Sequence, residues 1–332
     1  MNISQKHLVA VLLGAVLIGS GCTIGGGGKT DSEKQSTTSP IQVQEFSAFP
    51  NPAPESNKVT FTLTMKNTGE VTAENVKAKL WNPPFANTAQ DEATWRSENG
   101  GRVRQSDITY DFGKLQGTES GVDPFPKTEE IRLTAPNLRE GDAWSYQFNA
   151  EIRYEYTTQG STSLTAMNSE TFQESSQERT TNIDIPTNSA PITLSGRIRT
   201  GNPIVFYQDE NGPKNAVLCI DVKNKGSGTV YSPEASTGNS YNLQDSYENK
   251  LDLTVEVVGS TRVSAEGNSF SKTAEKEVSL VDGDQARPCF TLEVSPPTQG
   301  SQKTIGPISV TADYVYTKDS STTVTVNGRA NN

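Results

Sequence analysis

The chain has 332 residues, a length that suggests about two domains. Hydrophobic residues make up only 32% of it, which favours thin two-layer β-structure over a large α/β core. A net charge of −10 makes the chain a poor candidate for binding nucleic acid through its phosphates. The single histidine, His7, lies in a segment that we expect to be removed, so the mature chain would lack the residue that Ser-His-Asp, Cys-His and His-ligated zinc chemistry requires.

Residues 1–21 have the pattern of an export signal. Lys6 precedes an apolar run, Leu8–Ile18, that is shorter than the roughly 20 residues of a membrane-spanning helix. Small residues and then Cys22 follow, an arrangement that resembles the lipobox of lipoproteins, in which the cysteine becomes the first mature residue and is lipid-modified. We therefore expect Cys22 to anchor the chain to the membrane. Gly19 stands where most lipoboxes have leucine, and an uncleaved N-terminal anchor is the alternative.

Residues 22–40 are expected to form a flexible tether. The segment contains four consecutive glycines, Gly25–Gly28, followed by polar residues. Directly after a lipid-anchored cysteine, such a tether would lift a folded body clear of the lipid headgroups. The glycines have no strand before them and no helix after them, so they do not match a phosphate-binding loop.

Strand patterns begin after residue 40. Between residues 59 and 66 apolar and polar side chains alternate, which is the period of a half-buried strand. The apolar positions are Val59, Phe61, Leu63 and Met65. The strand ends at the turn Asn67-Thr68-Gly69, and alternation resumes from Glu74 to Trp81.

A long loop follows this second strand, from Trp81 to about Ile108, and it is rich in aromatic residues. Its aromatic side chains are Trp81, Phe85 and Trp95. Rigid aromatics supply a large contact area at low entropic cost, so these three residues form a possible contact loop. The competing interpretation, which we favour, is that the loop folds back and buries its aromatics as a satellite core.

The second half of the chain repeats the first. The strand Ala216–Val222 alternates and ends at Asn224-Lys225-Gly226, 157 positions after the first turn. Two further matches follow in the same order in both halves: Glu140-Gly141-Asp142 with Asp282-Gly283-Asp284, and Tyr154–Thr157 with Tyr314–Thr317. Three ordered matches predict an internal duplication. In the first copy, no clear turn separates Trp144 from Tyr156.

The run Val59–Leu80 resembles the start of the Ig-like domains of archaeal and bacterial surface proteins, the CARDB-type and S-layer-associated groups. These domains share a strand ending in Asn-x-Gly and a later Gly-Asp or Gly-Glu turn, and both halves of this chain contain the two elements. The resemblance implies an all-β fold with two tandem Ig-like antiparallel β-sandwich domains, over residues 41–182 and 190–332. Its motifs are turn chemistry, so they specify fold and leave function open.

We predict a disulfide between Cys219 and Cys289. The 157-residue offset aligns Cys219 with Thr62, on the outward face of its strand, and Cys289 also faces outward because Phe290 and Leu292 follow the inward pattern. In Ig-like sandwiches these second and fifth strands are neighbours in one sheet, so outward cysteines can meet across the ladder. Export to an oxidising surface would preserve the bond, and two separate buried thiols are the alternative.

The acidic residues suggest turns rather than catalysis. Asp282-Gly283-Asp284 and Glu140-Gly141-Asp142 fit hairpin or corner turns, and no segment has the ligand spacing of a calcium loop. We therefore expect no catalytic residues, no metal site and no cofactor. Carboxylate pairs remain numerous enough that counting alone does not eliminate a hydrolase.

The sequence favours a lipid-anchored, extracytoplasmic, surface-exposed protein without catalytic activity, with a structural or adhesive role in the cell envelope. Its expected partners are the membrane, through the N-terminal lipid, and an envelope protein or glycan. The alternative is a solute- or glycan-binding lipoprotein that uses the aromatic loop of the first domain. A deep cavity between the two sandwiches would support that alternative.

Overall fold

The computed structural model describes residues 39–85, 94–103, 108–118, 123–207, 212–236, 243–267, 269–297 and 302–329. The expected signal segment, Cys22 and nearly all of the tether lie outside these ranges. Residues 35–332 belong to one compact unit. None of the helices in the described ranges is long and apolar enough to cross a membrane.

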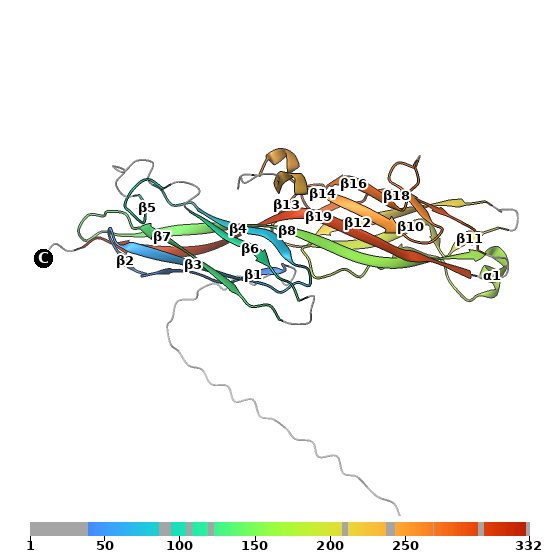
Figure 1. The fold of residues 1–332 in the computed structure, drawn as a ribbon, viewed down its shortest axis with the longest axis horizontal. Coiled ribbons are helices and arrows are strands. Elements are labelled where there is room, and N and C mark those ends of the chain that lie inside the picture. The colour runs from blue at the N-terminus through green and yellow to red at the C-terminus, as the bar shows by residue number, and fades with distance from the viewer. Residues whose placement is uncertain are drawn as a thin grey trace, which may run out of the picture. The chain divides into compact units, whose positions relative to one another are not determined.

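The fold is all-β, as predicted, and the strands of the described ranges form three sheets (Figure 1). The first sheet has the order β1 (Ile41–Phe49), β3 (Lys58–Asn67), β7 (Lys127–Thr134), β5 (Arg96–Ser97). The second has the order β15 (Arg262–Ser264), β18 (Cys289–Val294), β12 (Lys214–Asn224), β10 (Ile192–Asn202), β9 (Thr180–Ile183), and β17 (Gln285–Ala286) also pairs with β12. Alternating side chains of both sheets are buried, which gives each one face toward the core.

The third sheet contains strands from both halves of the chain. Its order is β16 (Thr273–Ser279), β14 (Lys250–Val257), β19 (Gln302–Asn327), β8 (Ala143–Asn168), β4 (Ala73–Trp81), β6 (Thr109–Leu115). Three short strands pair at its margins: β2 (Ala53–Pro54), β11 (Ile204–Phe206) and β13 (Thr229–Tyr231). Helical segments are short: α1 (Ser169–Glu174), η2 (Pro233–Ser236) and η3 (Asp245–Tyr247).

The strand orders confirm the predicted duplication, but the match of Glu140-Gly141-Asp142 with Asp282-Gly283-Asp284 is wrong. The first turn precedes β8 and the second precedes β17 and β18, and these strands are not equivalent in the two copies. The series β1-β3-β7-β5 of the first half corresponds to β10-β12-β18-β15 of the second, and β6-β4-β8 corresponds to β16-β14-β19. From either edge of the third sheet, equivalent strands therefore follow in the same order, and β8 and β19 pair with each other at the centre. This arrangement is a pseudo-twofold relation between the two copies.

The central pair joins the copies. Strands β8 and β19 each span 26 residues and pair from Ala143↔Asn327 to Met167↔Gln302, and Figure 1 shows them side by side in green and red. The far end of β8 pairs with β11 of the second copy, and the far end of β19 pairs with β2 of the first. The missing turn between Trp144 and Tyr156 thus reflects a single continuous strand. The boundaries 41–182 and 190–332 stay a prediction, and the third sheet is continuous across them.

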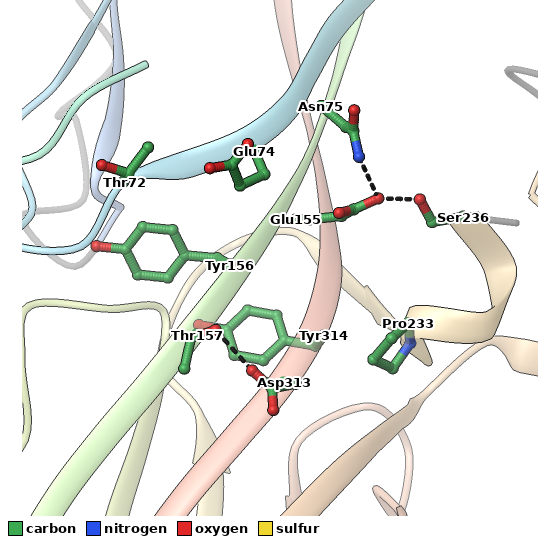
Figure 2. A pocket seen from close by; sticks show the side chains of 10 residues that line it. All are labelled: Thr72, Glu74, Asn75, Glu155, Tyr156, Thr157, Pro233, Ser236, Asp313 and Tyr314. Carbon is green, nitrogen blue, oxygen red and sulfur yellow. Dashed lines mark hydrogen bonds between the residues drawn. The ribbon is translucent and has the colours of Figure 1, made fainter. Parts of the chain in front are cut away.

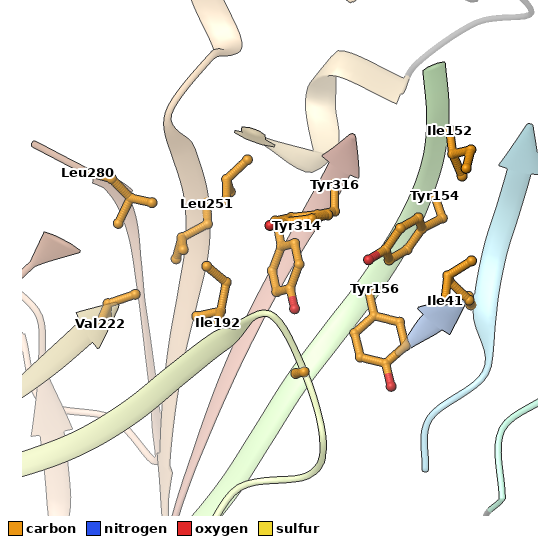
Figure 3. Packing of buried hydrophobic residues seen from close by; sticks show 14 of the residues in the cluster. Ile41, Ile152, Tyr154, Tyr156, Ile192, Val222, Leu251, Leu280, Tyr314 and Tyr316 are labelled. Atoms are coloured by element: carbon orange, nitrogen blue, oxygen red, sulfur yellow. The ribbon is translucent and has the colours of Figure 1, made fainter. Parts of the chain in front are cut away.

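Four buried tyrosines lie where the two long strands cross the centre of the sheet (Figure 3). Tyr154 pairs with Tyr316 and Tyr156 with Tyr314, so the repeated Tyr-x-Tyr motifs meet each other. The rings of Tyr154 and Tyr316 lie 5.7 Å apart, and those of Tyr156 and Tyr314 lie 6.5 Å apart. Burial raises the pKa of Tyr316 to about 12 and raises that of Tyr154 and Tyr314 above the usual value.

The Asn-x-Gly turns dock onto these tyrosines. Asn67 donates from its amide to the carbonyls of Val71 (2.8 Å) and Leu115 (2.9 Å), and Asn224 donates in the same way to Gly228 (2.9 Å). A Cβ at Gly226 would collide with the hydroxyl of Tyr316, and only glycine fits so close an approach. The motif that signals a turn in the sequence is therefore also a packing contact.

Candidate functional site

Trp95 is a core residue, and its proposed role as a contact residue is wrong. Its side chain is fully buried, and its ring lies edge-on to Phe61, Tyr146 and Phe148 at 5.7, 5.7 and 4.9 Å. The physical reason is that a large apolar ring gains more from burial against an open sandwich edge than from exposure in a loop. The satellite-core interpretation holds for this residue.

The other two aromatics of the loop differ from Trp95. Phe85 is half-buried, packs on the core and lies 6.3 Å from the ring of Phe148. Trp81, at the end of β4, remains 40% exposed, so it is the one member of the three that presents a large surface to solvent. Residues 86–93 and 104–107 of the loop lie outside the described residues.

The predicted disulfide between Cys219 and Cys289 is present. The two cysteines are direct partners in the β12–β18 ladder, as the alignment of the copies predicts. Both lie on the outer face of the second sheet, because their neighbours Leu218 and Phe290 point into the core. Cys219 is nevertheless buried, with arginines of the same face around it.

A cavity of about 460 Å³ opens beside the centre of the third sheet, and residues of both copies line it (Figure 2). We call it the waist cavity. Strand β4 and the turn before it, strands β8 and β19, and helix η2 provide its walls. Its lining residues are Thr72, Glu74, Asn75, Glu155, Tyr156, Thr157, Pro233, Ser236, Asp313 and Tyr314.

Hydrogen bonds hold the three carboxylates of the waist cavity. Glu155 accepts from the amide of Asn75 at 2.8 Å and from the hydroxyl of Ser236. Asp313 accepts from the hydroxyl of Thr157 at 2.6 Å, and Glu74 forms an ion pair with Lys114 at 2.9 Å. The carboxylates thus tie β4, β8, β19 and η2 together around the opening.

Two local features of the chain position these groups. Strand β4 has an irregularity between Ala73 and Val76, where Asn75 adopts a left-handed φ of 49° that asparagine tolerates better than most residues. The second is an insertion in the second copy, which contains η2 and brings Ser236 to Glu155. The partner of Glu155 across the ladder is Val315, so the cavity has no symmetric counterpart at that position.

The waist cavity presents carboxylate, hydroxyl and aromatic groups, a set suited to holding a polar or cationic ligand by hydrogen bonds. Among the described residues, no cluster of His, Cys, Asp or Glu side chains is arranged to bind a metal ion. The sequence places Glu155 inside the first repeated tyrosine motif and Asp313 directly before the second, and neither was predicted to be a site residue. The available signal was their place in the two long strands, but pairing of those strands with each other was not predicted.

Comparisons with known proteins do not add to this description. No protein family model and no curated protein matches the chain. Among solved structures, the N-terminal region of the enterococcal surface protein is 9% identical over 86% of this chain and 87% of its own, with a TM-score of 0.15. The collagen adhesin of S. aureus is 9% identical over 90% and 96%, with a TM-score of 0.11. Similarities at this level carry no argument about function.

Proposed function

We propose that this protein is a lipid-anchored, non-catalytic component of the cell envelope whose folded part is an interaction module. The observation behind the proposal is the continuous β8–β19 ladder, which joins the two sandwich copies into one body. A body without a flexible linker between its copies keeps contact surfaces on both copies in a fixed relation, which suits assembly in an envelope. Membrane attachment at Cys22 supplies the location.

Two carboxylates of the waist cavity have structural contacts, which supports the proposal that the protein is not catalytic. Glu155 is held by two hydrogen bonds, and Asp313 by one, to groups of neighbouring elements. A general acid or base needs access to a substrate proton, whereas these carboxylates accept bonds that fix the geometry of the fold. No nucleic acid partner is proposed, since the net charge is −10.

The test is membrane attachment of the full chain. We expect the membrane-extracted protein to begin at Cys22 and to have the added mass of lipid, and we expect Cys22→Ser to release it into the soluble fraction. Ser20→Ala is the matched control, because it leaves a small residue before the cysteine. An unmodified chain starting at Met1, or membrane retention of Cys22→Ser, would contradict the proposal.

A solute-binding lipoprotein is the second candidate, and the waist cavity is the observation that favours it. The cavity of about 460 Å³ lies between elements of both copies, where a ligand would contact Glu155, Tyr156 and Asp313. The aromatic loop would take no part in this site, because Trp81 lies at the far end of β4 from Glu74 and is not among the residues that line the cavity. A thermal-shift screen of sugars, amines and amino acids tests it, with Asp313→Asn as the variant that should abolish any shift.

A further inference from the structure

The outer face of the second sheet is basic, although the chain as a whole is acidic. We call this surface the basic face, defined by Arg197, Arg199, Lys223 and Arg287 with Asp221 among them. Arg197 and Arg287 both pair with the carboxylate of Asp221, whose side chain is 11% exposed, while each arginine is about half exposed. One buried carboxylate shared by two arginines leaves positive charge at the surface.

Other groups on the strands of that face do not cancel the charge, although exposed Asp184 directly follows β9 and exposed Asp284 directly precedes β17. Arg199 and Lys223 are exposed on the same side of β10 and β12, next to the disulfide and Asp221. A further ion pair, Arg262 with Glu293, is neutral as a whole. The strands of this face therefore display an excess of positive charge in a chain of net charge −10.

The opposite layer of the same copy is acidic on its outer side. We call this surface the acidic face, defined by Asp252, Glu256, Glu275, Glu277 and Asp313. Asp252 lies between Glu277 on β16 and Asp313 on β19, each its direct partner in the ladder. Burial and these neighbouring carboxylates raise the pKa of Asp252. Lys250, paired with Glu277 at 3.2 Å, is the basic residue on these strands of the face.

Like charges directly opposite each other in a sheet are destabilising, so the acidic row is unfavourable for this chain alone. The first copy provides an internal comparison. At the positions of Asp252, Asp313 and Glu277 it has Lys77, Arg153 and Asp111, a row of mixed charge.

The basic face is only partly repeated in the first copy, where Lys66 corresponds to Lys223. At the positions of Arg197 and Arg199 the first copy has Ser47 and Phe49 on β1. The polarity across the sandwich therefore belongs to the second copy and is not a property of the fold.

We propose that the basic face of one molecule binds the acidic face of a second copy of the same chain, so that molecules associate face to back through their second copies. The proposal rests on the interaction role given above and is independent of lipid at Cys22. The charge complementarity of the two faces identifies the partner. Because the contact joins two different surfaces, each bound pair still has one free basic face and one free acidic face, so further molecules can add in a row or close into a ring. A basic face opposite an acidic lipid surface is the competing occupant.

The test is sedimentation velocity of the full chain in a non-ionic detergent. At about 20 mM salt we expect the average mass to rise with concentration, and at about 0.5 M salt, where the Debye length falls to about 4 Å, we expect a single monomer. Arg199→Glu with Lys223→Glu reverses two of the four basic charges of the basic face and leaves the pairs of Arg197 and Arg287 with Asp221 in place. Glu275→Lys with Glu277→Lys weakens the acidic face at an exposed edge strand.

The two variants make a specific mixing prediction. Each alone should remain monomeric, with association weakened at least about tenfold. Mixed together they should form a one-to-one pair and no longer species, because each retains one intact face of opposite kind. Random charge effects do not predict this stoichiometry.

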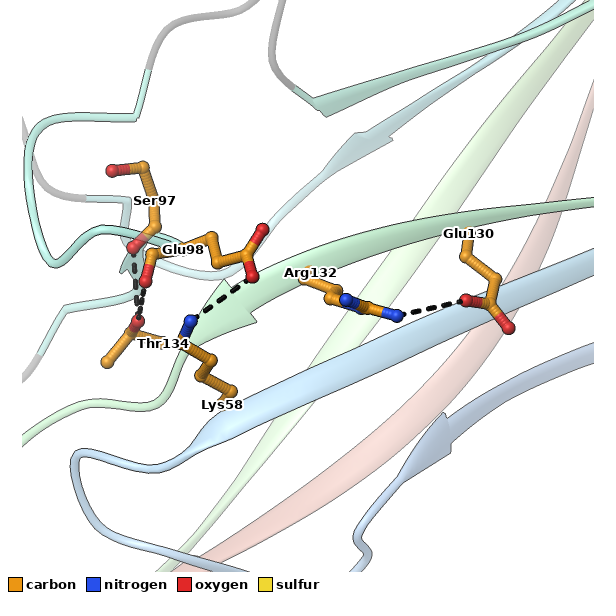
Figure 4. Close-up of polar contacts among 6 residues, drawn as sticks. All are labelled: Lys58, Ser97, Glu98, Glu130, Arg132 and Thr134. Atoms are coloured by element: carbon orange, nitrogen blue, oxygen red, sulfur yellow. Dashed lines mark hydrogen bonds and ion pairs between the residues drawn. The ribbon is translucent and has the colours of Figure 1, made fainter.

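The matched control reverses two basic residues on the first copy. Lys58 and Arg132 are exposed on the outer face of the first sheet, in ion pairs with Glu98 and Glu130 (Figure 4). Lys58→Glu with Arg132→Glu changes the net charge as much as the basic-face variant does, and it should leave self-association intact. The proposal would be overturned if the wild-type chain stays monomeric at low salt, or if the control variant loses self-association as much as the basic-face variant does. It would also be overturned if Arg199→Glu with Lys223→Glu loses binding to acidic-phospholipid vesicles but keeps its self-association.

Discussion

At the residue scale, the same side-chain type serves different purposes according to where the sheet places it. Trp95 fills the core edge, while Trp81 of the same loop remains 40% exposed. Alternation along a strand assigns faces reliably, but a loop has no period and gives no such assignment. The burial of an aromatic side chain in this loop can be tested by the free energy of unfolding that is lost when the side chain is truncated.

Trp95→Ala is expected to lower the free energy of unfolding by about 3–5 kcal/mol, because it removes a fully buried ring that contacts three aromatic neighbours. Trp81→Ala, at an exposed position, should cost less than about 1 kcal/mol. Urea denaturation measures both. Equal losses in the two variants would show that Trp81 is also part of the core.

Lys318 gives a pH dependence with a defined sign. Burial lowers the pKa of its ammonium group from 10.5 to about 8. Between about pH 8 and 10.5 the unfolded chain binds more protons than the folded one, so stability should rise with pH across this window, by about 3 kcal/mol in total. Above about pH 10 the buried tyrosines oppose this, because their raised pKa makes ionisation favour the unfolded chain.

The internal duplication supplies the control for this prediction. Lys318 on β19 donates to the carbonyl of Ile41, and at the equivalent position on β8 of the first copy Thr158 donates to the carbonyl of Ile192 at 3.3 Å. Lys318→Thr should therefore keep the contact and lose the rise in stability from pH 8 to 10. Denaturation midpoints across that range measure it, and an unchanged rise in the variant would assign the effect to another group.

At the element scale, the disulfide links neighbouring strands of the second copy across 70 residues of sequence. Constraining a loop of this length in the unfolded chain is worth roughly 4 kcal/mol in the chain-entropy model. We expect Cys219→Ala with Cys289→Ala to lower the free energy of unfolding by about that amount while the far-UV circular dichroism is retained. A loss of well under about 1 kcal/mol would mean that the unfolded chain is already compact there.

The two copies also share a turn that was not among the sequence matches between the two halves. Asn51 accepts from the backbone N–H of Thr325 at 3.0 Å, and Asn202 accepts from that of Thr165 at 2.8 Å. Each asparagine precedes a proline and leads into a short strand, β2 or β11, that pairs in parallel with a long strand of the other copy. The Asn-Pro pair is visible in both halves of the sequence, but its meaning depends on a strand distant in sequence.

At the scale of the whole molecule, the copies complete each other and should unfold together. Strand β8 of the first copy pairs with β11 of the second, and β19 of the second pairs with β2 of the first. Neither sandwich retains all of its strands if the other unfolds, so one transition is expected where two independent domains would give two. All three tryptophans lie in the first copy and report on it.

The measurement compares tryptophan fluorescence with hydrogen exchange of β12 amides, which report on the second copy. Both should show the same denaturation midpoint, and Phe148→Ala, a core change in the first copy, should lower the two equally. A β12 midpoint that stays unchanged in this variant would show that the copies unfold independently.

The sequence by itself determined the all-β class, the duplication, the outward face of the cysteines and their bond. These follow from short-range period, turn chemistry and the alignment of one copy with the other, all of which depend on neighbouring residues. Tertiary structure alone decided that β8 and β19 pair with each other, that Trp95 is core, and that Glu155, Asp313 and Ser236 meet at one cavity. The physical reason is that strand partners and loop burial depend on which distant surfaces exclude water together, and no local pattern encodes that choice.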